Sequence, residues 1–131
     1  MTTLDKVLQK QKLGLITINE HKKLGDIIDK LLDTQRKAIL VTENNGELVG
    51  MVSESDIIKA VGKYGKEASD VVIHEIMTES LIVSPPLTEA QEALRIMSKN
   101  RIRHLPVVTE HGHMLGVVGV VELVSSVMGE E

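Results

Sequence analysis

The chain has 131 residues, of which 42% are hydrophobic and 26% charged, as is typical of a single globular domain. Its formal charge of −4 and its single aromatic residue argue against a nucleic-acid-binding surface, which needs a basic patch or platforms for base stacking. The absence of cysteine excludes disulfides, thiolate metal sites and thiol nucleophiles. No apolar run approaches the roughly 20 residues of a membrane span, and the N-terminus lacks the apolar run of a signal peptide. We therefore expect a cytoplasmic protein without membrane insertion.

An internal repeat is the strongest pattern in the sequence. The segment Gly46–Val52 reappears as Gly112–Val118, an offset of 66 residues, and the same offset aligns apolar positions over nearly the whole chain. Each copy has roughly 55 to 60 residues, which is marginal for an independent core, so we expect the two copies to pack together with function in their shared crevice.

The first copy follows a short amphipathic lead-in at Thr3–Gln11. Helical spacing of leucine and isoleucine indicates the helices, and short β-branched runs indicate the strands. Asn44-Asn45-Gly46 is a typical hairpin turn, and Gly62 is a typical helix C-terminus. The predicted elements are a strand at 15–18, a helix at 22–33, strands at 38–42 and 48–53, and a helix at 54–61.

The glycines and mixed charges of Gly62–Glu75 are typical of a connector, after which the second copy repeats the same order. Pro85-Pro86 ends its first strand, Asn100 is the expected C-cap of its first helix, and His111-Gly112 is its hairpin turn. The predicted elements are a strand at 81–84, a helix at 88–99, strands at 105–108 and 115–119, and a helix to about Met128. The fold class is α/β (α+β), with a mixed sheet covered by helices.

The turn from the third strand into its helix carries the clearest chemical signal. In Gly50-Met51-Val52-Ser53-Glu54-Ser55-Asp56, the helix N-terminus and the Ser53 hydroxyl can hold a phosphate, and Asp56 can accept both hydroxyls of a ribose. The same Ser-x-x-Asp spacing is also a capping box, in which the two side chains serve only the helix end. Residues alone leave both interpretations open.

The repeated strand–helix–hairpin–helix order resembles a tandem pair of cystathionine-β-synthase (CBS) domains, a Bateman module, as in stand-alone CBS-domain proteins. The matching residues are Ile76-Met77-Thr78, Ile82-Val83-Ser84-Pro85, Ile102–Val108 and the turn at Gly50–Asp56. The resemblance implies one CBS pair over residues 1–131, with motifs at 10–62 and 76–128, a connector at 63–75, and β-α-β-β-α units packed pseudo-twofold through their sheets.

The resemblance also implies a site for an adenosine-containing nucleotide, with Ser53 near phosphate and Asp56 on the ribose. By position only, it places adenine against Ile16, Thr17, Ala38 and Ile39. It implies that basic residues face the phosphates, which here means Lys37, Arg103 and His104. For Arg103, the alternative is a solvated side chain that, with Lys99 and Arg101, complements the end of the preceding helix.

The second copy has Gly119 where the first has Ser53, and Glu122 where the first has Asp56. Because glutamate is one methylene longer, we expect a weaker second site, formed by Val83, Gly119 and Glu122. His111 and His113 could ligate a metal only with a third ligand that the sequence does not supply, so a solvated turn is favoured there and at His21 and His74.

No nucleophile, carboxylate pair or open metal site is apparent, so we expect no enzyme and no required cofactor. The favoured hypothesis is a regulatory sensor of an adenine nucleotide (AMP, ADP, ATP or an NADH-like ligand) that changes dimer geometry or partner affinity. A ligand-free dimerisation scaffold for a separately encoded enzyme or transporter, and a small nucleotide-acting enzyme, are the alternatives. The resemblance further implies a disk-like homodimer and a possible separate effector protein.

Overall fold

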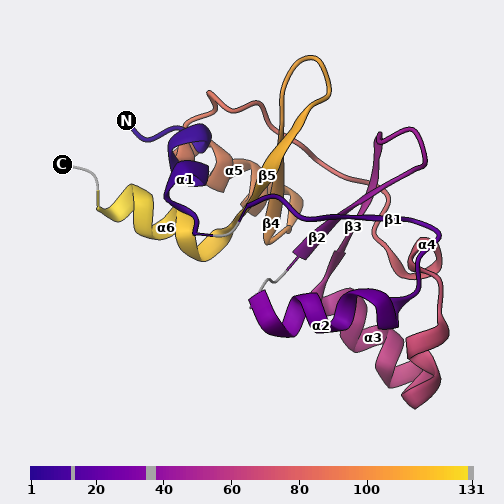
Figure 1. Cartoon of the computed structure of the whole chain (residues 1–131). Coiled ribbons are helices and arrows are strands. Elements are labelled where there is room, and N and C mark those ends of the chain that lie inside the picture. The colour runs from indigo at the N-terminus through magenta and orange to yellow at the C-terminus, as the bar shows by residue number, and fades with distance from the viewer. Residues whose placement is uncertain (13, 35–37, 130–131) are drawn as a thin grey trace. The chain divides into compact units, whose positions relative to one another are not determined.

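The structure is a computed structural model that describes residues 1–12, 14–34 and 38–129, with the backbone alone at 32–34. The chain divides into two compact units, one of which is a continuous segment inserted into the sequence of the other (Figure 1). One unit is Ile16–Leu81. The other combines Met1–Leu15 with Ile82–Glu131.

The unit Ile16–Leu81 is built on a three-stranded mixed sheet. Strand β2 is central, pairing parallel with β1 and antiparallel with β3. Helices α2 and α3 lie against one face of this sheet (Figure 1). The predicted order of elements and the bounds of β2 and β3 are confirmed: β1 Thr17–Asn19, α2 Leu24–Thr34, β2 Ala38–Thr42, β3 Leu48–Ser53 and α3 Glu54–Tyr64.

The core of this unit lies between the sheet and the two helices. Alternate residues of β2 face the helices, as the twofold period of a strand requires. The predicted apolar face of α2 supplies the opposite side, with Ile27 fully buried. The buried residues of this cluster are Ile18, Leu24, Ile27, Leu31, Ile39, Val41, Val52, Ala60, Ala68 and Ile73.

The predicted helix end at Gly62 is wrong. Helix α3 continues to Tyr64 and ends at Gly65, whose positive φ of 62° favours glycine because glycine has no Cβ. A glycine inside a helix weakens it by only about 1 kcal/mol, which packing of the helix can offset. The predicted connector then folds as a 3₁₀ helix, η1 Gly65–Asp70, and a short helix, α4 Ile73–Ile76.

The other unit repeats the plan with a two-stranded antiparallel sheet. The elements are α1 Leu4–Lys10, α5 Ala90–Asn100, β4 His104–Val108, β5 Met114–Gly119 and α6 Val120–Met128. Its buried cluster draws on both halves of the sequence: Leu4, Val7, Ala90, Ala93, Met97, Leu105, Val107, Val118 and Leu123. The expected α+β class with two similar units is confirmed.

Two predictions for the second copy are wrong. Residues 81–84 form no strand: only Ser84 makes a parallel bridge, to Val107. Pro85 and Pro86 have no N–H with which to extend this bridge beyond Ser84. Asn100 is not the C-cap. Arg101 takes that place with φ 54°, while the Asn100 amide donates to the Ile96 carbonyl at 2.8 Å.

Each unit is completed by the segment that precedes the other copy in sequence. Residues 73–78 lie against β3, where a Cβ added to Gly50 would come within 2.6 Å of Met77 Sδ. Helix α1 lies against β5, where a Cβ added to Gly116 would come within 2.8 Å of Leu8. The two glycines occupy equivalent positions of the repeat, so the same notch in each sheet admits a lead-in segment.

Candidate functional site

The sequence-predicted turn lies where β3 passes into α3. Ser53 ends β3 and is the N-cap of α3, with extended backbone angles (φ −107°, ψ 172°). The strand register places Ala38 directly opposite Ser53, so two of the predicted ligand residues are neighbours across β2 and β3. Ser53 and Asp56 are both half-buried, which leaves part of each side chain accessible.

The Asp56 carboxylate is oriented by the turn itself. Its Oδ2 accepts hydrogen bonds from the Ser53 backbone N–H at 2.8 Å and from the Ser53 hydroxyl at 3.0 Å. Acceptance of the N-cap N–H is one half of a capping box, so the structural interpretation of Ser-x-x-Asp is satisfied. A carboxylate has about four acceptor positions, so these two bonds do not exhaust it.

Thr78 is the functional neighbour that sequence reasoning missed. Its hydroxyl lies 3.1 Å from Asp56 Oδ1 and 3.3 Å from Oδ2. Two backbone hydrogen bonds fix its place against β3: Thr78 N–H donates to the Met51 carbonyl at 2.8 Å, and Met51 N–H to the Thr78 carbonyl at 3.0 Å. Thr78 belongs to the Ile76-Met77-Thr78 motif identified in the sequence. No sequence pattern near it indicates a contact with a carboxylate 22 positions earlier.

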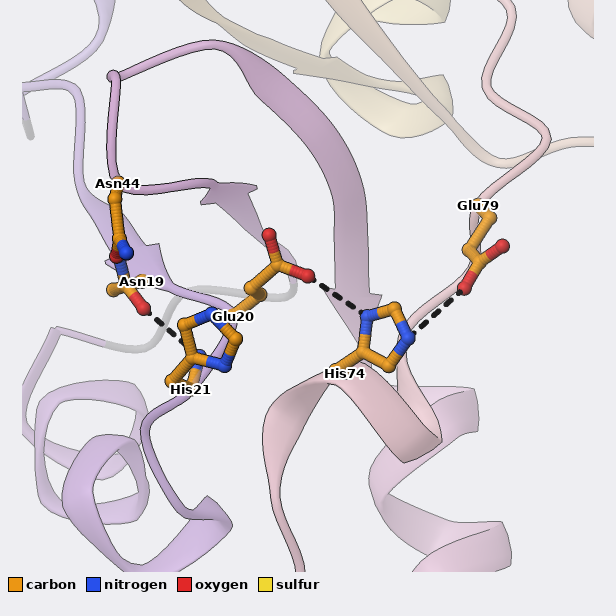
Figure 2. A network of polar contacts seen from close by, with 6 residues as sticks. All are labelled: Asn19, Glu20, His21, Asn44, His74 and Glu79. Carbon is orange, nitrogen blue, oxygen red and sulfur yellow. Dashed lines mark hydrogen bonds and ion pairs between the residues drawn. The ribbon is translucent and has the colours of Figure 1, made fainter.

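A network of polar contacts holds the segment that carries Thr78 against the end of β1 (Figure 2). His74 Nδ1 lies 2.9 Å from Glu20 Oε1, and His74 Nε2 lies 4.0 Å from Glu79 Oε1. The His74 backbone N–H also donates to the Glu20 carbonyl at 2.9 Å. On the other side, Asn19 Oδ1 accepts the His21 backbone N–H at 2.9 Å. His74 is therefore exposed but tied to the end of β1, where a solvated turn was favoured from sequence.

The equivalent turn of the second copy has the same plan with different side chains. Gly119, the N-cap of α6, lies opposite His104 in the β4–β5 ladder, as Ser53 lies opposite Ala38. Glu122 Oε1 accepts the Gly119 N–H at 2.8 Å. The longer glutamate therefore reproduces the capping bond of Asp56. In place of Thr78, the donor from the lead-in segment is Gln11, 2.9 and 3.1 Å from the two Glu122 oxygens.

The predicted adenine-contacting residues differ in exposure. Thr17 begins β1, opposite Leu40, and is half-buried, while Ile16 precedes the strand and packs against the core. Ile39 is only 1% exposed and its side chain belongs to the core, so a ligand would meet its backbone. Lys37 lies outside the described residues.

The remaining predicted residues belong to the other unit. Arg103 is exposed and its backbone carbonyl accepts the Val120 N–H at 3.1 Å, next to the α6 N-terminus. His104 is half-buried at the start of β4. Val83 is 45% exposed and lies in no strand. A role for Arg103 or His104 at Asp56 stays a prediction.

The histidine pair at the second hairpin is exposed, and His113 donates its backbone N–H to Thr109 Oγ1 at 3.0 Å. Across residues 1–12, 14–34 and 38–129, no group of three His, Asp or Glu side chains is arranged to hold a metal ion. Within the same ranges no helix has both the length and the apolar character needed to cross a bilayer.

The sequence model of the CBS domain matches the chain twice, at residues 12–63 and 73–129. The chain belongs to the CBS-domain family. Together the two matches cover most of the sequence and confirm the tandem pair. The second CBS match begins at residue 73, whereas residues 73–81 pack in the unit that holds the first match.

Two relatives are longer proteins, each of which matches this chain over part of its length. The chain is 30% identical over 102 residues to an inosine-5'-monophosphate dehydrogenase of Nitrosopumilus maritimus, covering 78% of this chain and 20% of the relative. It is 34% identical over 96 residues to the mitochondrial CBS domain-containing protein CBSX3 of Arabidopsis thaliana, covering 70% of this chain and 46% of that one. The chain thus spans less than half of either relative.

Solved CBS structures share the fold over almost the entire chain. A protein with CBS domains from Burkholderia ambifaria is 25% identical with a TM-score of 0.87, covering 99% of this chain and 96% of that one. The CBS pair of protein MJ0100, in complex with 5-methylthioadenosine and S-adenosyl-L-methionine, is 23% identical with a TM-score of 0.83, covering 100% and 99%. CBSX2 in complex with AMP is 23% identical with a TM-score of 0.79, covering 98% and 97%.

Proposed function

We propose that this CBS pair is a regulatory module that binds an adenosine-containing nucleotide at the turn between β3 and α3. The observation that carries the proposal is the Asp56 carboxylate, which the Ser53 N–H and two hydroxyls hold at the start of a helix while it stays half-buried. Two proteins of the same fold are complexes with AMP and with S-adenosyl-L-methionine, both adenosine compounds.

The chemistry of the turn suits a nucleoside phosphate. Ser53 fills two of the roughly four acceptor positions of Asp56, so vicinal ribose hydroxyls that displace the exposed Thr78 hydroxyl can donate to the carboxylate. Such hydrogen bonds are charge-assisted and therefore strong. The N-terminal amides of α3 and the Ser53 hydroxyl supply donors and partial positive charge for a phosphate. Ala38, opposite Ser53, leaves room for a flat base beside the strand because its side chain is a single methyl group.

The other predicted contacts complete the proposal. Ile16, Thr17 and the Ile39 backbone would line the base, since they lie on or next to β1 and β2 of the same unit. Lys37, Arg103 and His104 would face the phosphates. Arginine grips phosphate in bidentate fashion, and histidine adds a donor.

Binding would act through association with a second chain or an effector. Helix α3 exposes Ile58 (70%) and Val61 (47%), three residues apart on one face, and helix α6 exposes Val121, Val124 and Met128 at spacings of three and four. These apolar stripes favour a homodimer formed through helices. We further propose that the protein acts in the cytoplasm. They also favour the second candidate function, a ligand-free dimerisation scaffold for a separate enzyme or transporter.

Melting the protein with and without AMP, ADP, ATP, NADH and S-adenosylmethionine tests the proposal, because a ligand that binds only the folded state raises the midpoint. We expect one of them to raise it, and Asp56→Glu to reduce the rise to less than about half. No rise with any of the five, together with a dimer in solution, would instead support the scaffold. Turnover of a nucleotide by the pure protein, lost in Asp56→Ala, would support an enzyme.

A further inference from the structure

The two turns of the repeat differ in how the lead-in segment holds the carboxylate. At the first turn the donor is the Thr78 hydroxyl, which has one proton, rotates freely and belongs to an exposed residue. At the second turn the donor is the Gln11 carboxamide, which also donates to the Val117 carbonyl and belongs to a half-buried residue.

Both protons of the Gln11 amide have partners. Nε2 lies 2.9 Å from the Val117 carbonyl oxygen in β5 and 2.9 Å from Glu122 Oε1 in α6. The amide nitrogen is thus anchored to a strand and to a helix at once. Its hydrogen bond to Glu122 is charge-assisted, and such bonds are roughly twice as strong as neutral ones.

The backbone of Gln11 is also held in place by its neighbours in the fold. It follows α1, and its backbone N–H donates to the Leu8 carbonyl at 3.1 Å. Leu8 in turn fills the notch that Gly116 leaves in β5, where its Cδ2 would be 2.8 Å from an added Cβ. Packing of α1 therefore places the carboxamide beside Val117 and Glu122, which lie 106 and 111 positions later in the sequence.

We propose that Gln11 is an autoinhibitory latch on the second turn. The amide proton that Val117 does not accept is directed at the Glu122 carboxylate, with Nε2 within 3.1 Å of both oxygens, where ribose hydroxyls would bind Asp56 in the first turn. A nucleotide at the second turn must first displace this intramolecular donor. The chain then binds one nucleotide, at the Asp56 turn, and α1 controls whether the second turn opens. This inference rests on the proposed function for its ligand, but the latch itself does not depend on it.

Equilibrium dialysis of the full chain against saturating AMP, ADP, ATP, NADH and S-adenosylmethionine measures the number of nucleotides bound per chain. For the parent protein we expect one. Gln11→Ala is expected to bind a second, and affinity at the second turn should rise about tenfold or more, the equivalent of one hydrogen bond to a charged group. Gln9→Ala is the matched control, since Gln9 is an exposed glutamine in α1, two residues before Gln11.

Gln11→Met separates the effect of the lost hydrogen-bond donor from the effect of lost side-chain volume, because the methionine side chain has similar length and no N–H. It also provides a second variant in case Gln11→Ala does not fold. A double-mutant cycle of Gln11→Met with Glu122→Gln should show coupling in the free energy of unfolding, independently of any ligand. Absence of coupling, or Gln11→Ala that binds no more nucleotide than the parent, would overturn the latch. If the parent binds none and Gln11→Ala binds one that survives Asp56→Glu, the latch is supported and the Asp56 site fails.

Discussion

Replacing Asp56 by glutamate separates the two roles of the carboxylate. The second copy already shows what glutamate does at this position, because Glu122 accepts the N-cap N–H at 2.8 Å, the same distance as Asp56. Asp56→Glu should therefore keep the helix cap while moving the carboxylate away from a bound ribose by one methylene. Asp56→Ala, in contrast, removes the cap as well.

The expected magnitudes differ enough to distinguish the roles. Loss of a cap costs about 0.5–2 kcal/mol, so Asp56→Ala should unfold at lower temperature without any ligand. Asp56→Glu should stay within about 0.5 kcal/mol of the parent, as surface substitutions do. A ligand present at 100 times its Kd stabilises the parent by about 2.7 kcal/mol. Losing one charge-assisted hydrogen bond weakens binding by about 1.5–3 kcal/mol, which reduces that stabilisation to about 0.3–1.3 kcal/mol.

The assay is thermal melting of the parent, Asp56→Glu and Asp56→Ala at one fixed concentration of the nucleotide that stabilises the parent. For a chain of this size a stabilisation of 2.7 kcal/mol corresponds to a rise of about 10 °C. We expect that rise in the parent and less than about half of it in Asp56→Glu. An Asp56→Glu protein with the parent's full ligand shift would refute the role of Asp56 on the ribose, and one that melts like Asp56→Ala without ligand would refute the shared capping geometry.

Three further substitutions, with Gly62→Ala as a comparison for one of them, test the segment that supports the site. Thr78→Val removes the hydroxyl at equal volume and should lower the free energy of unfolding by about 1 kcal/mol in urea titrations; an unchanged value would mean that the hydrogen bond contributes nothing. His74→Ala leaves Glu20, whose side chain is 13% exposed, without its imidazole partner, so we expect a loss of about 1–3 kcal/mol and faster amide exchange at residue 74; parent-like exchange there would contradict the tie. Gly50→Ala places a Cβ within 2.6 Å of a packed side chain and should destabilise by about 1–3 kcal/mol, whereas Gly62→Ala, with nothing within 4 Å inside α3, should stabilise. Equal effects of the two alanines would show that packing at β3 is not tight.

The hairpins were predictable because their signals are local. The bounds of β2 and β3 follow from β-branched and apolar runs on either side of Asn44-Asn45-Gly46, and the repeat carries the same inference to β4 and β5. The turn at Ser53 was predictable for the same reason, since a Ser-x-x-Asp spacing defines its own geometry.

Features that depend on distant segments were not predictable. Glycine at position 62 favours a helix end locally, yet α3 continues past it because Ala60 is buried against the rest of its unit. The pairing of Thr78 with Asp56 and of Gln11 with Glu122 joins residues 22 and 111 positions apart. Spacing within one copy cannot reveal such contacts, because each lead-in segment packs on a turn of the other copy.

The most direct measurement is a crystal structure of the chain grown with each of the five nucleotides in turn. We predict a nucleotide whose two ribose hydroxyls lie within hydrogen-bond distance of the Asp56 carboxylate, about 2.5–3.0 Å, with its phosphate beside Ser53 and the first amides of α3. Crystals in which a nucleotide binds away from α3, or in which Asp56 keeps only its bonds to Ser53 and Thr78 at saturating nucleotide, would contradict the proposed site.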